Sequence, residues 1–355
     1  MTASSTKKRA VVVCPGRGTY NKDELGYFHR YHADKMRLLD TVDTYRAQQQ
    51  QIAIADLDKA EAYNMRLHTA GENASALIYA CALGDFLSID QDEYEIVAVT
   101  GNSMGWYIAL AVAQAVNETN AVHLINTMGS MMKNGVIGGQ IIYPLVDDNW
   151  CWDSEREAML IEIVADLNTQ DGVEIYTSIK LGGFMVYGAN QAGLIALEKA
   201  LPPLDDRYPM KLFNHAAFHT PLLKDISEKA LQQLPASLFQ TPSLPLIDGR
   251  GHIWQPYATN TAKLHDYTLA YQVYEHYDYT AAIQVAVKEF APDNLIILGP
   301  GSTLGGATAQ SLIQLDWQNM SSKTDFINRQ KSEPFVIAMG MEDQRKLVDK
   351  LLRSK

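Results

Sequence analysis

The chain has few cysteines, no excess of basic residues and no long apolar run. Its three cysteines, Cys14, Cys81 and Cys151, are far apart and odd in number, so neither a disulfide framework nor a zinc site is indicated. The formal net charge of −11 argues against a nucleic-acid partner, which would need clustered Lys and Arg. No run approaches the roughly 20 apolar residues that span a bilayer. The apolar run at 10–14 is too short for a signal peptide and ends in Pro-Gly. We therefore expect a cytoplasmic protein without a membrane partner.

What the chain does have is the balance of residue types of a globular protein. Hydrophobic residues make up 47% of the 355 residues and charged residues 20%, which is enough apolar material for a substantial core. This length suits one large domain, or one large domain with a smaller insert. We see no sequence repeat and no low-complexity segment.

Hydrophobic periodicity predicts alternating strands and helices. Strands are expected at residues 10–13, 95–100, 140–146, 173–180, 183–189, 210–214 and 294–298. Helices are expected over much of 27–87 and at 120–133, 154–168, 191–201, 221–233 and 268–290. Within 139–214 the order is β-α-β-β-α-β, which is a ferredoxin-like unit. The sequence thus predicts an α/β fold in which residues 1–137 and 215–355 form the body and 138–214 form an inserted small subdomain.

A nucleophilic serine is indicated at residue 103. An apolar run from Val97 breaks into Gly-x-Ser-x-Gly at 101–105 and resumes as a helix-like stretch from Ile108. This is the strand-elbow-helix signature of α/β-hydrolase-like proteins, in which the helix N-terminus offers free N–H groups to a developing oxyanion. An ordinary turn is the alternative interpretation, and the flanking strand and helix count against it.

A serine hydroxyl needs a base to be nucleophilic at neutral pH. His219 stands between the end of the inserted unit and the start of a predicted helix, where its imidazole can project back toward the elbow. A capping or packing role is the alternative for a lone histidine in such a place. His215 is the competing base.

With these pieces in place, the chain resembles the malonyl-CoA:acyl carrier protein transacylase family and the related acyltransferase domains of polyketide synthases. The resemblance runs from Cys14 to about Leu312 and rests on motifs in the family's order. These are Pro15-Gly16-Arg17-Gly18, Gly101-Asn102-Ser103-Met104-Gly105, Phe218-His219, Gln272 in a helix, and Gly299-Pro300-Gly301-Ser302-Thr303-Leu304. The inserted ferredoxin-like unit lies between the serine and the histidine, as the family requires.

The resemblance implies a role for each matched residue. Ser103 is the acyl-accepting nucleophile, and His219 is its general base and acid. The backbone N–H groups of Arg17 and Met104 form the oxyanion hole, and the backbone carbonyl of Gln272 orients the imidazole. The implied partners are an acyl-CoA and an acyl carrier protein, with no cofactor and no metal.

Several departures from the family pattern fall in the expected acyl pocket. Met128 stands where malonyl-specific members have an arginine that pairs with the malonyl carboxylate, and an unpaired buried carboxylate would cost several kcal/mol or more. Asn102 replaces a histidine, and Trp106-Tyr107 adds bulk near the helix that lines the pocket. We place Asn102, Trp106, Met128, Met132 and Phe218 in the pocket. For the methionines at 128, 131 and 132, core packing on one helix is an equal alternative to a pocket role.

Arg17 replaces a glutamine of the family pattern. Its backbone role survives the substitution, while its side chain either points to solvent or supplies a relocated cation for a carboxylate or for the CoA phosphates. The sequence therefore predicts an acyl-CoA:acyl carrier protein S-acyltransferase of fatty acid or polyketide biosynthesis, with a malonyl or an uncarboxylated acyl group. Two alternatives stay open: a thioester hydrolase of the same fold, and a non-catalytic scaffold that retains the fold.

Overall fold

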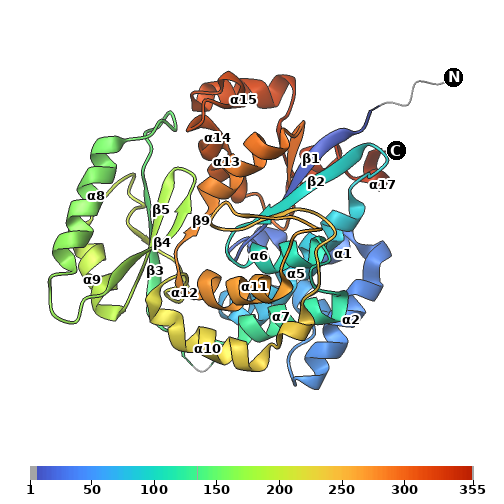
Figure 1. Ribbon diagram of the computed structural model, residues 1–355, viewed down its shortest axis with the longest axis horizontal. Helices are drawn as coiled ribbons and strands as arrows, with labels where there is room; N and C mark the ends of the chain where they lie inside the picture. The colour runs from blue at the N-terminus through green and yellow to red at the C-terminus, as the bar shows by residue number, and fades with distance from the viewer. Residues whose placement is uncertain (1–5, 134, 354–355) are drawn as a thin grey trace.

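The body of the molecule is built on a largely parallel sheet. The computed structural model describes residues 6–133 and 135–353 (Figure 1). The sheet has the order β11-β10-β1-β2-β7-β8, and all neighbours are parallel except β7 and β8. Its strands are β1 (Lys8–Cys14), β2 (Tyr94–Gly101), β7 (Leu246–Ile247), β8 (Ile253–Trp254), β10 (Asn294–Ile297) and β11 (Val336–Ala338).

Helices cover both faces of this sheet. Figure 1 shows α13 (Tyr279–Phe290) and α14 (Leu304–Ile313) on one side of β1 and β2, with α5 (Gly71–Ser88), α6 (Gly105–Val112) and α7 (Glu118–Ser130) on the other. Residues 10–14 of β1 are therefore fully buried. This two-sided burial explains why the first strand is a continuous apolar run rather than an alternating one.

The inserted unit forms a second sheet of order β6-β3-β5-β4-β9. Its elements are β3 (Gly139–Pro144), α8 (Ser154–Leu167), β4 (Ile175–Leu181), β5 (Phe184–Ala189), α9 (Gln191–Ala200) and β6 (Met210–Lys211). The first four strands of the sheet pair antiparallel in the order expected of a ferredoxin-like unit. The α/β body with its ferredoxin-like subdomain is thus confirmed, while the residue boundaries given above for the two units stay a prediction.

Three parts of the predicted secondary structure are wrong. The helix expected at 268–290 is a π-helical turn at Tyr267–Tyr271, then α12 (Gln272–Tyr274), the strand β9 (Tyr277–Asp278) and finally α13. Tyr277 is buried and pairs with Ile179 of β4. Apolar residues therefore continue through the strand, and the sequence pattern does not show that the helix is interrupted there. The strands β7, β8 and β11 were not expected, since two or three residues are too short to show a period. The strand expected at 210–214 shrinks to β6.

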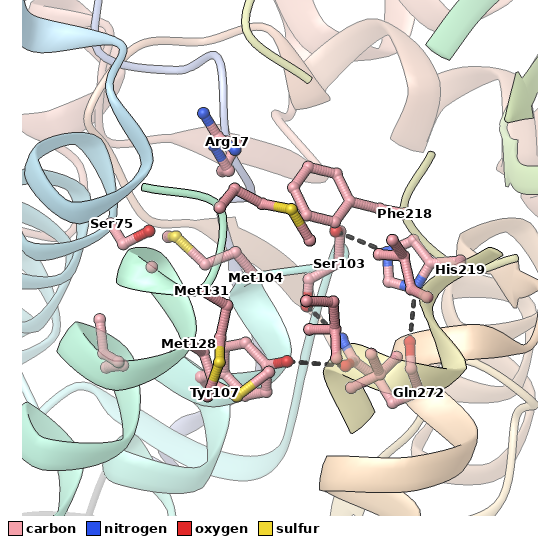
Figure 2. Close-up of a pocket in the computed structure, with 16 residues that line it drawn as sticks. Arg17, Ser75, Ser103, Met104, Tyr107, Met128, Met131, Phe218, His219 and Gln272 are labelled. Atoms are coloured by element: carbon pink, nitrogen blue, oxygen red, sulfur yellow. Dashed lines mark hydrogen bonds between the residues drawn. The ribbon is translucent and has the colours of Figure 1, made fainter. Parts of the chain in front are cut away.

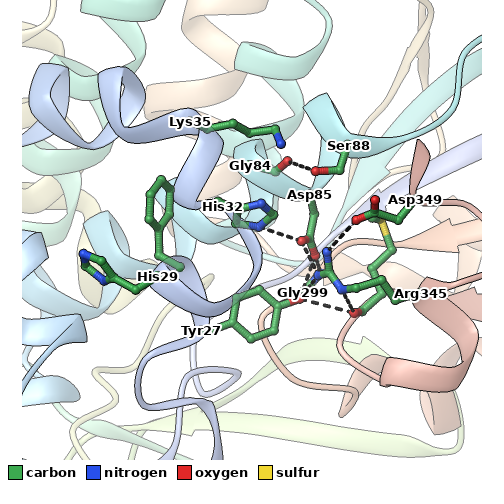
Figure 3. Close-up of polar contacts among 12 residues, drawn as sticks. Tyr27, His29, His32, Lys35, Gly84, Asp85, Ser88, Gly299, Arg345 and Asp349 are labelled. Atoms are coloured by element: carbon green, nitrogen blue, oxygen red, sulfur yellow. Dashed lines mark hydrogen bonds and ion pairs between the residues drawn. The ribbon is translucent and has the colours of Figure 1, made fainter. Parts of the chain in front are cut away.

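A buried polar network joins distant parts of the body (Figure 3). Asp85 of α5 accepts hydrogen bonds from the Gly299 N–H at 2.6 Å and the Tyr27 hydroxyl at 2.8 Å, and contacts His32 Nε2 at 2.9 Å. It also forms an ion pair with Arg345 of α16 (Glu342–Arg345). Burial raises the pKa of Asp85, but the charge of Arg345 and the bond from His32 outweigh it and hold the pKa at about 2. The network therefore fixes the loop after β10 to α5.

The remaining helices complete the body around these layers. They are α1 (Tyr27–Tyr31), α2 (Met36–Gln48), α3 (Ile54–Asp58), α4 (Met65–His68), α10 (Lys224–Gln233), α11 (Thr261–Asp266), α15 (Lys323–Ser332) and α17 (Lys350–Arg353). Over the described residues, no helix combines the length and the apolar character that crossing a membrane requires.

Candidate active site

Ser103 lies on a tight turn between β2 and α6. Its φ is +54°, in the left-handed region that L-residues rarely adopt. The turn requires glycine on both sides, because a Cβ on Gly101 would lie 2.5 Å from the backbone of Gly105, and one on Gly105 would lie 2.3 Å from the carbonyl oxygen of Cys14. The sequence pattern Gly-x-Ser-x-Gly thus corresponds to a nucleophile elbow, with the strained serine at its tip.

A hydrogen-bonded relay starts at the Ser103 hydroxyl (Figure 2). Ser103 Oγ lies 2.7 Å from His219 Nε2, and His219 Nδ1 lies 2.6 Å from the carbonyl oxygen of Gln272. A carbonyl oxygen can only accept, so Nδ1 carries the proton and Nε2 presents a lone pair to the serine. The three residues come from β2–α6, the segment before α10, and α12.

The environment of His219 keeps its imidazole neutral. The side chain is buried, and burial lowers the pKa to about 4, against the raising effect of the bond to Gln272 and with a small contribution from His276. Its backbone is held in the left-handed region at φ +57° and donates its N–H to the Val273 carbonyl at 3.1 Å. A neutral, oriented imidazole is the form that can accept a proton from serine.

The competing base, His215, faces a different partner. Its Nδ1 contacts Gln140 Oε1 at 2.8 Å, and its pKa is lowered to about 3 by burial and by the charge of Arg17. The structure therefore brings His219, and not His215, onto Ser103.

The two expected oxyanion donors flank the serine. The loop after β1 packs directly against the elbow, since a Cβ on Gly16 would lie 2.6 Å from the carbonyl oxygen of Asn102. Arg17 and Met104 line one cavity together with Ser103. Within the described part of the chain, no acceptor binds the backbone N–H of either residue. Both N–H groups remain available to an oxyanion.

The cavity beside Ser103 is mainly apolar. Of the expected pocket residues, Met128, Met132 and Phe218 line it. Met131 and Tyr107, which were considered near the pocket but not placed in it, also face the cavity (Figure 2). The other lining residues are Ser75, Ile125, Gly129, Leu223, Ile226, Gln272 and Val273.

Two of the expected pocket residues do not line the cavity. Trp106 is fully buried on another side of α6, where its Nε1 donates to Thr268 Oγ1 at 3.0 Å and its ring meets that of Tyr267 edge to face. Asn102 is buried at the elbow, and its Oδ1 has no hydrogen-bond partner within the described residues. The placement of both residues in the acyl pocket is therefore corrected.

The side chain of Gln272 adds a contact that the sequence did not indicate. Its Nε2 donates to the Ser103 carbonyl oxygen at 3.0 Å, and its Oε1 accepts from the Tyr107 hydroxyl at 2.9 Å. Gln272 thus contacts His219 through its main chain and Ser103 through its side chain. Nothing in the sequence around Tyr107, which directly follows the buried Trp106, indicates the hydrogen bond between Tyr107 and Gln272.

Among the described residues, no group of three or more His, Cys, Asp or Glu side chains is placed to hold a metal ion. The expectation of a site without metal or cofactor stays a prediction.

Comparisons with known proteins agree with the fold and with the resemblance seen in the sequence. No family model matches the chain. A malonyl CoA-acyl carrier protein transacylase of Salmonella typhimurium is 24% identical over 214 residues, a match that takes in 59% of this chain and 64% of the relative. The match therefore covers less than two thirds of that relative.

Solved structures extend the likeness to the whole chain. The malonyl-CoA:acyl carrier protein transacylase of Xanthomonas oryzae superposes with a TM-score of 0.72 at 14% identity, covering 99% of each chain. The malonyl-CoA:acyl carrier protein transacylase of Synechocystis superposes with a TM-score of 0.72 at 16% identity, covering 98% of this chain and 100% of the other. An acyltransferase domain of the salinomycin polyketide synthase superposes with a TM-score of 0.66 at 15% identity, covering 95% of this chain and 70% of the other. The chain has the fold that these transacylases and acyltransferase domains share.

Proposed function

We propose that the protein moves an acyl group from coenzyme A to the phosphopantetheine thiol of an acyl carrier protein through an acyl-Ser103 intermediate. The relay from Ser103 Oγ through His219 to the Gln272 carbonyl, with links of 2.7 and 2.6 Å, carries this proposal. The names of the similar proteins, which are malonyl transacylases and polyketide acyltransferase domains, support a transferase rather than a hydrolase or a scaffold.

The first half-reaction acylates the enzyme. Ser103 Oγ attacks the thioester carbonyl carbon while His219 Nε2 takes the hydroxyl proton. The Gln272 carbonyl stabilises the imidazolium, and the N–H groups of Arg17 and Met104 stabilise the oxyanion. Removal of one such donor typically costs on the order of 10²–10³ in rate. The C–S bond then breaks, and the CoA sulfur takes the proton from Nε2.

The second half-reaction reverses these roles. The carrier thiol attacks the acyl-Ser103 carbonyl and gives its proton to His219, and the C–O bond breaks with return of that proton to Ser103 Oγ. The thioester, the carrier thiol, Ser103 and His219 supply every atom and proton that the two half-reactions need. We therefore expect acyl-CoA to act as a substrate, and we expect no further cofactor to be needed. The unpaired cysteines support a reducing, cytoplasmic setting.

The cavity restricts the size of the acyl group. Its volume is about 60 Å³, whereas a single water occupies roughly 10–15 Å³ on the same measure. This supports a short acyl chain, either malonyl or uncarboxylated. The apolar thioether of Met128 offers a carboxylate no charge, so any selectivity for a carboxylated group must come from elsewhere in the wall.

Mass spectrometry of the intact protein tests the proposal. We expect a mass increase of one acyl group after mixing with acetyl-CoA or malonyl-CoA, its absence in Ser103→Ala, and its persistence in Ser237→Ala, which changes an exposed serine. Addition of a phosphopantetheinylated carrier protein should remove the acyl group far faster than buffer does. Equal loss in buffer and with carrier would indicate a hydrolase, and wild-type protein that acquires no acyl group would support the scaffold.

A further inference from the structure

Arg17 brings a positive charge to the wall of the acyl cavity. It follows β1 in the loop that packs on the elbow, and it lines the same cavity as Ser103 (Figure 2). Its side chain is only partly exposed. It does not point freely to solvent, which was one of the two possibilities that the sequence left open.

The contacts of the guanidinium are all with uncharged groups. Nη2 donates to the carbonyl oxygens of Thr69 at 2.9 Å and Asn214 at 3.1 Å, and the group lies over the ring of Phe218, 5.5 Å from its centroid. Nε is buried without an acceptor, and within the described chain no carboxylate lies at ion-pair distance from Arg17. A partly desolvated cation with an unsatisfied donor is costly unless an anion joins it.

No other lining residue offers a permanent charge. Burial lowers the pKa of Arg17 to about 10, although Glu72 opposes this, so the guanidinium remains protonated at neutral pH. His219 is neutral there because its pKa is about 4. Among the described residues that line the cavity, Arg17 is the sole arginine and there is no lysine. Met128, which lines the cavity from α7, carries no charge.

We propose that Arg17 determines substrate specificity, and that its guanidinium receives the free carboxylate of a short dicarboxylic acyl thioester such as a malonyl group. The proposal rests on the acyltransferase function above. Within the described residues, Nε and Nη1 of Arg17 donate to no protein acceptor, and a carboxylate accepts charge-assisted hydrogen bonds from such donors. The cation would thus come from the loop after β1, whereas the family pattern places it at position 128 on α7.

A competition experiment tests this assignment. Wild-type protein is mixed with equal concentrations of malonyl-CoA and acetyl-CoA, which differ only by the carboxylate, and the two acyl-enzyme masses are compared at short times. We expect the wild type to favour malonyl, and Arg17→Gln to lower the malonyl-to-acetyl ratio by about ten- to a hundredfold, the range of one hydrogen bond to a charged group. The ratio is the readout because Arg17 also offers its backbone N–H to the oxyanion, and a general loss of rate cancels in it.

Three further variants make the result specific. Arg17→Lys keeps a charge and should retain much of the malonyl preference. The double variant Arg17→Gln with Met128→Arg returns a guanidinium to the cavity from α7. It should restore part of the malonyl preference. Arg66→Gln removes a charge from an exposed arginine of α4 that does not line the cavity, and it should leave the ratio unchanged.

The outcomes separate this inference from the proposed function. A wild type that favours acetyl overturns the inference even if no Arg17 variant folds. A ratio that Arg17→Gln leaves unchanged also overturns it, and an equal rise of KM for both thioesters would assign the cation to the shared CoA part. Absence of acylation by either thioester in the wild type would instead overturn the proposed function, and this inference with it.

Discussion

The rate of Ser103 acylation should be nearly independent of pH from about 5.5 upward. The base must be neutral to accept the serine proton, and a lowered pKa extends the neutral form to lower pH. Burial lowers the pKa of His219 to about 4, so protonation should reduce the rate only as the pH falls toward 4. An exposed histidine would lose activity through the range around its ordinary pKa of about 6.5.

The size of the effect follows from these two values. At pH 5, a base of pKa about 4 is about 90% neutral, whereas a base of pKa about 6.5 is about 3% neutral. The rate at pH 5 should therefore stay within about 10% of its plateau, about 30-fold above the value for an unperturbed histidine. No partner carboxylate raises the pKa, because the acceptor of Nδ1 is the uncharged carbonyl of Gln272.

A substrate without ionising groups isolates the enzyme's own titration. We would acylate with the acetyl thioester of pantetheine, quench at short times between pH 4 and 8, and quantify acyl-enzyme by intact mass. Far-ultraviolet circular dichroism at each pH controls for unfolding. A midpoint near 6.5 in folded protein would refute the reasoning, because it would mean that the base is solvated or is not His219.

Three substitutions test other parts of the structure. His219→Ala should slow acylation by about 10²–10⁴-fold and His215→Ala by much less; comparable losses in quenched mass assays would mean that the base is wrongly assigned. Gly105→Ala should lower the free energy of unfolding in urea by roughly 1–3 kcal/mol or more, because its Cβ would lie 2.3 Å from a backbone oxygen, and an unchanged midpoint would contradict that packing. Asp85→Asn should cost roughly 3–5 kcal/mol as a broken buried ion pair; as a control, Asp92→Asn breaks only the exposed ion pair with Lys350 and should change the stability far less. Since the pKa of Asp85 is lowered to about 2, its contribution should be present above about pH 4 and lost as the pH falls through 2.

The elbow was predictable because its signal is local. Gly101, Ser103 and Gly105 lie within one five-residue segment, and their spacing indicates a tight turn, which the structure forms with Ser103 in the left-handed region. The pairing with His219 is different in kind, since 116 residues separate it from Ser103. The position of His219 before a predicted helix favoured it but left His215 as a competing base, and the resemblance to a family then selected His219. The physical reason for the choice, an accepting carbonyl at Gln272, exists only in the folded chain.

The lining of the cavity beside Ser103 was predicted less well, because a motif does not fix the rotation of a helix about its axis. Trp106 and Tyr107 are adjacent in the first turn of α6, and successive residues on a helix point about 100° apart. The structure turns Tyr107 into the cavity and Trp106 toward Thr268. That choice depends on a segment 162 residues away, which no local pattern reveals.

The interruption that made the predicted helix at 268–290 wrong supplies the carbonyl group that contacts the His219 ring. In an unbroken helix, the Gln272 carbonyl would accept the N–H of residue 276, four positions later. Instead α12 ends at Tyr274 and the chain becomes extended at Glu275, so the carbonyls of the last turn have no helical partner. Two of them are used by one residue: Gln272 O accepts His219 Nδ1, and Val273 O accepts the His219 backbone N–H. The end of a short helix therefore holds both the ring and the main chain of His219.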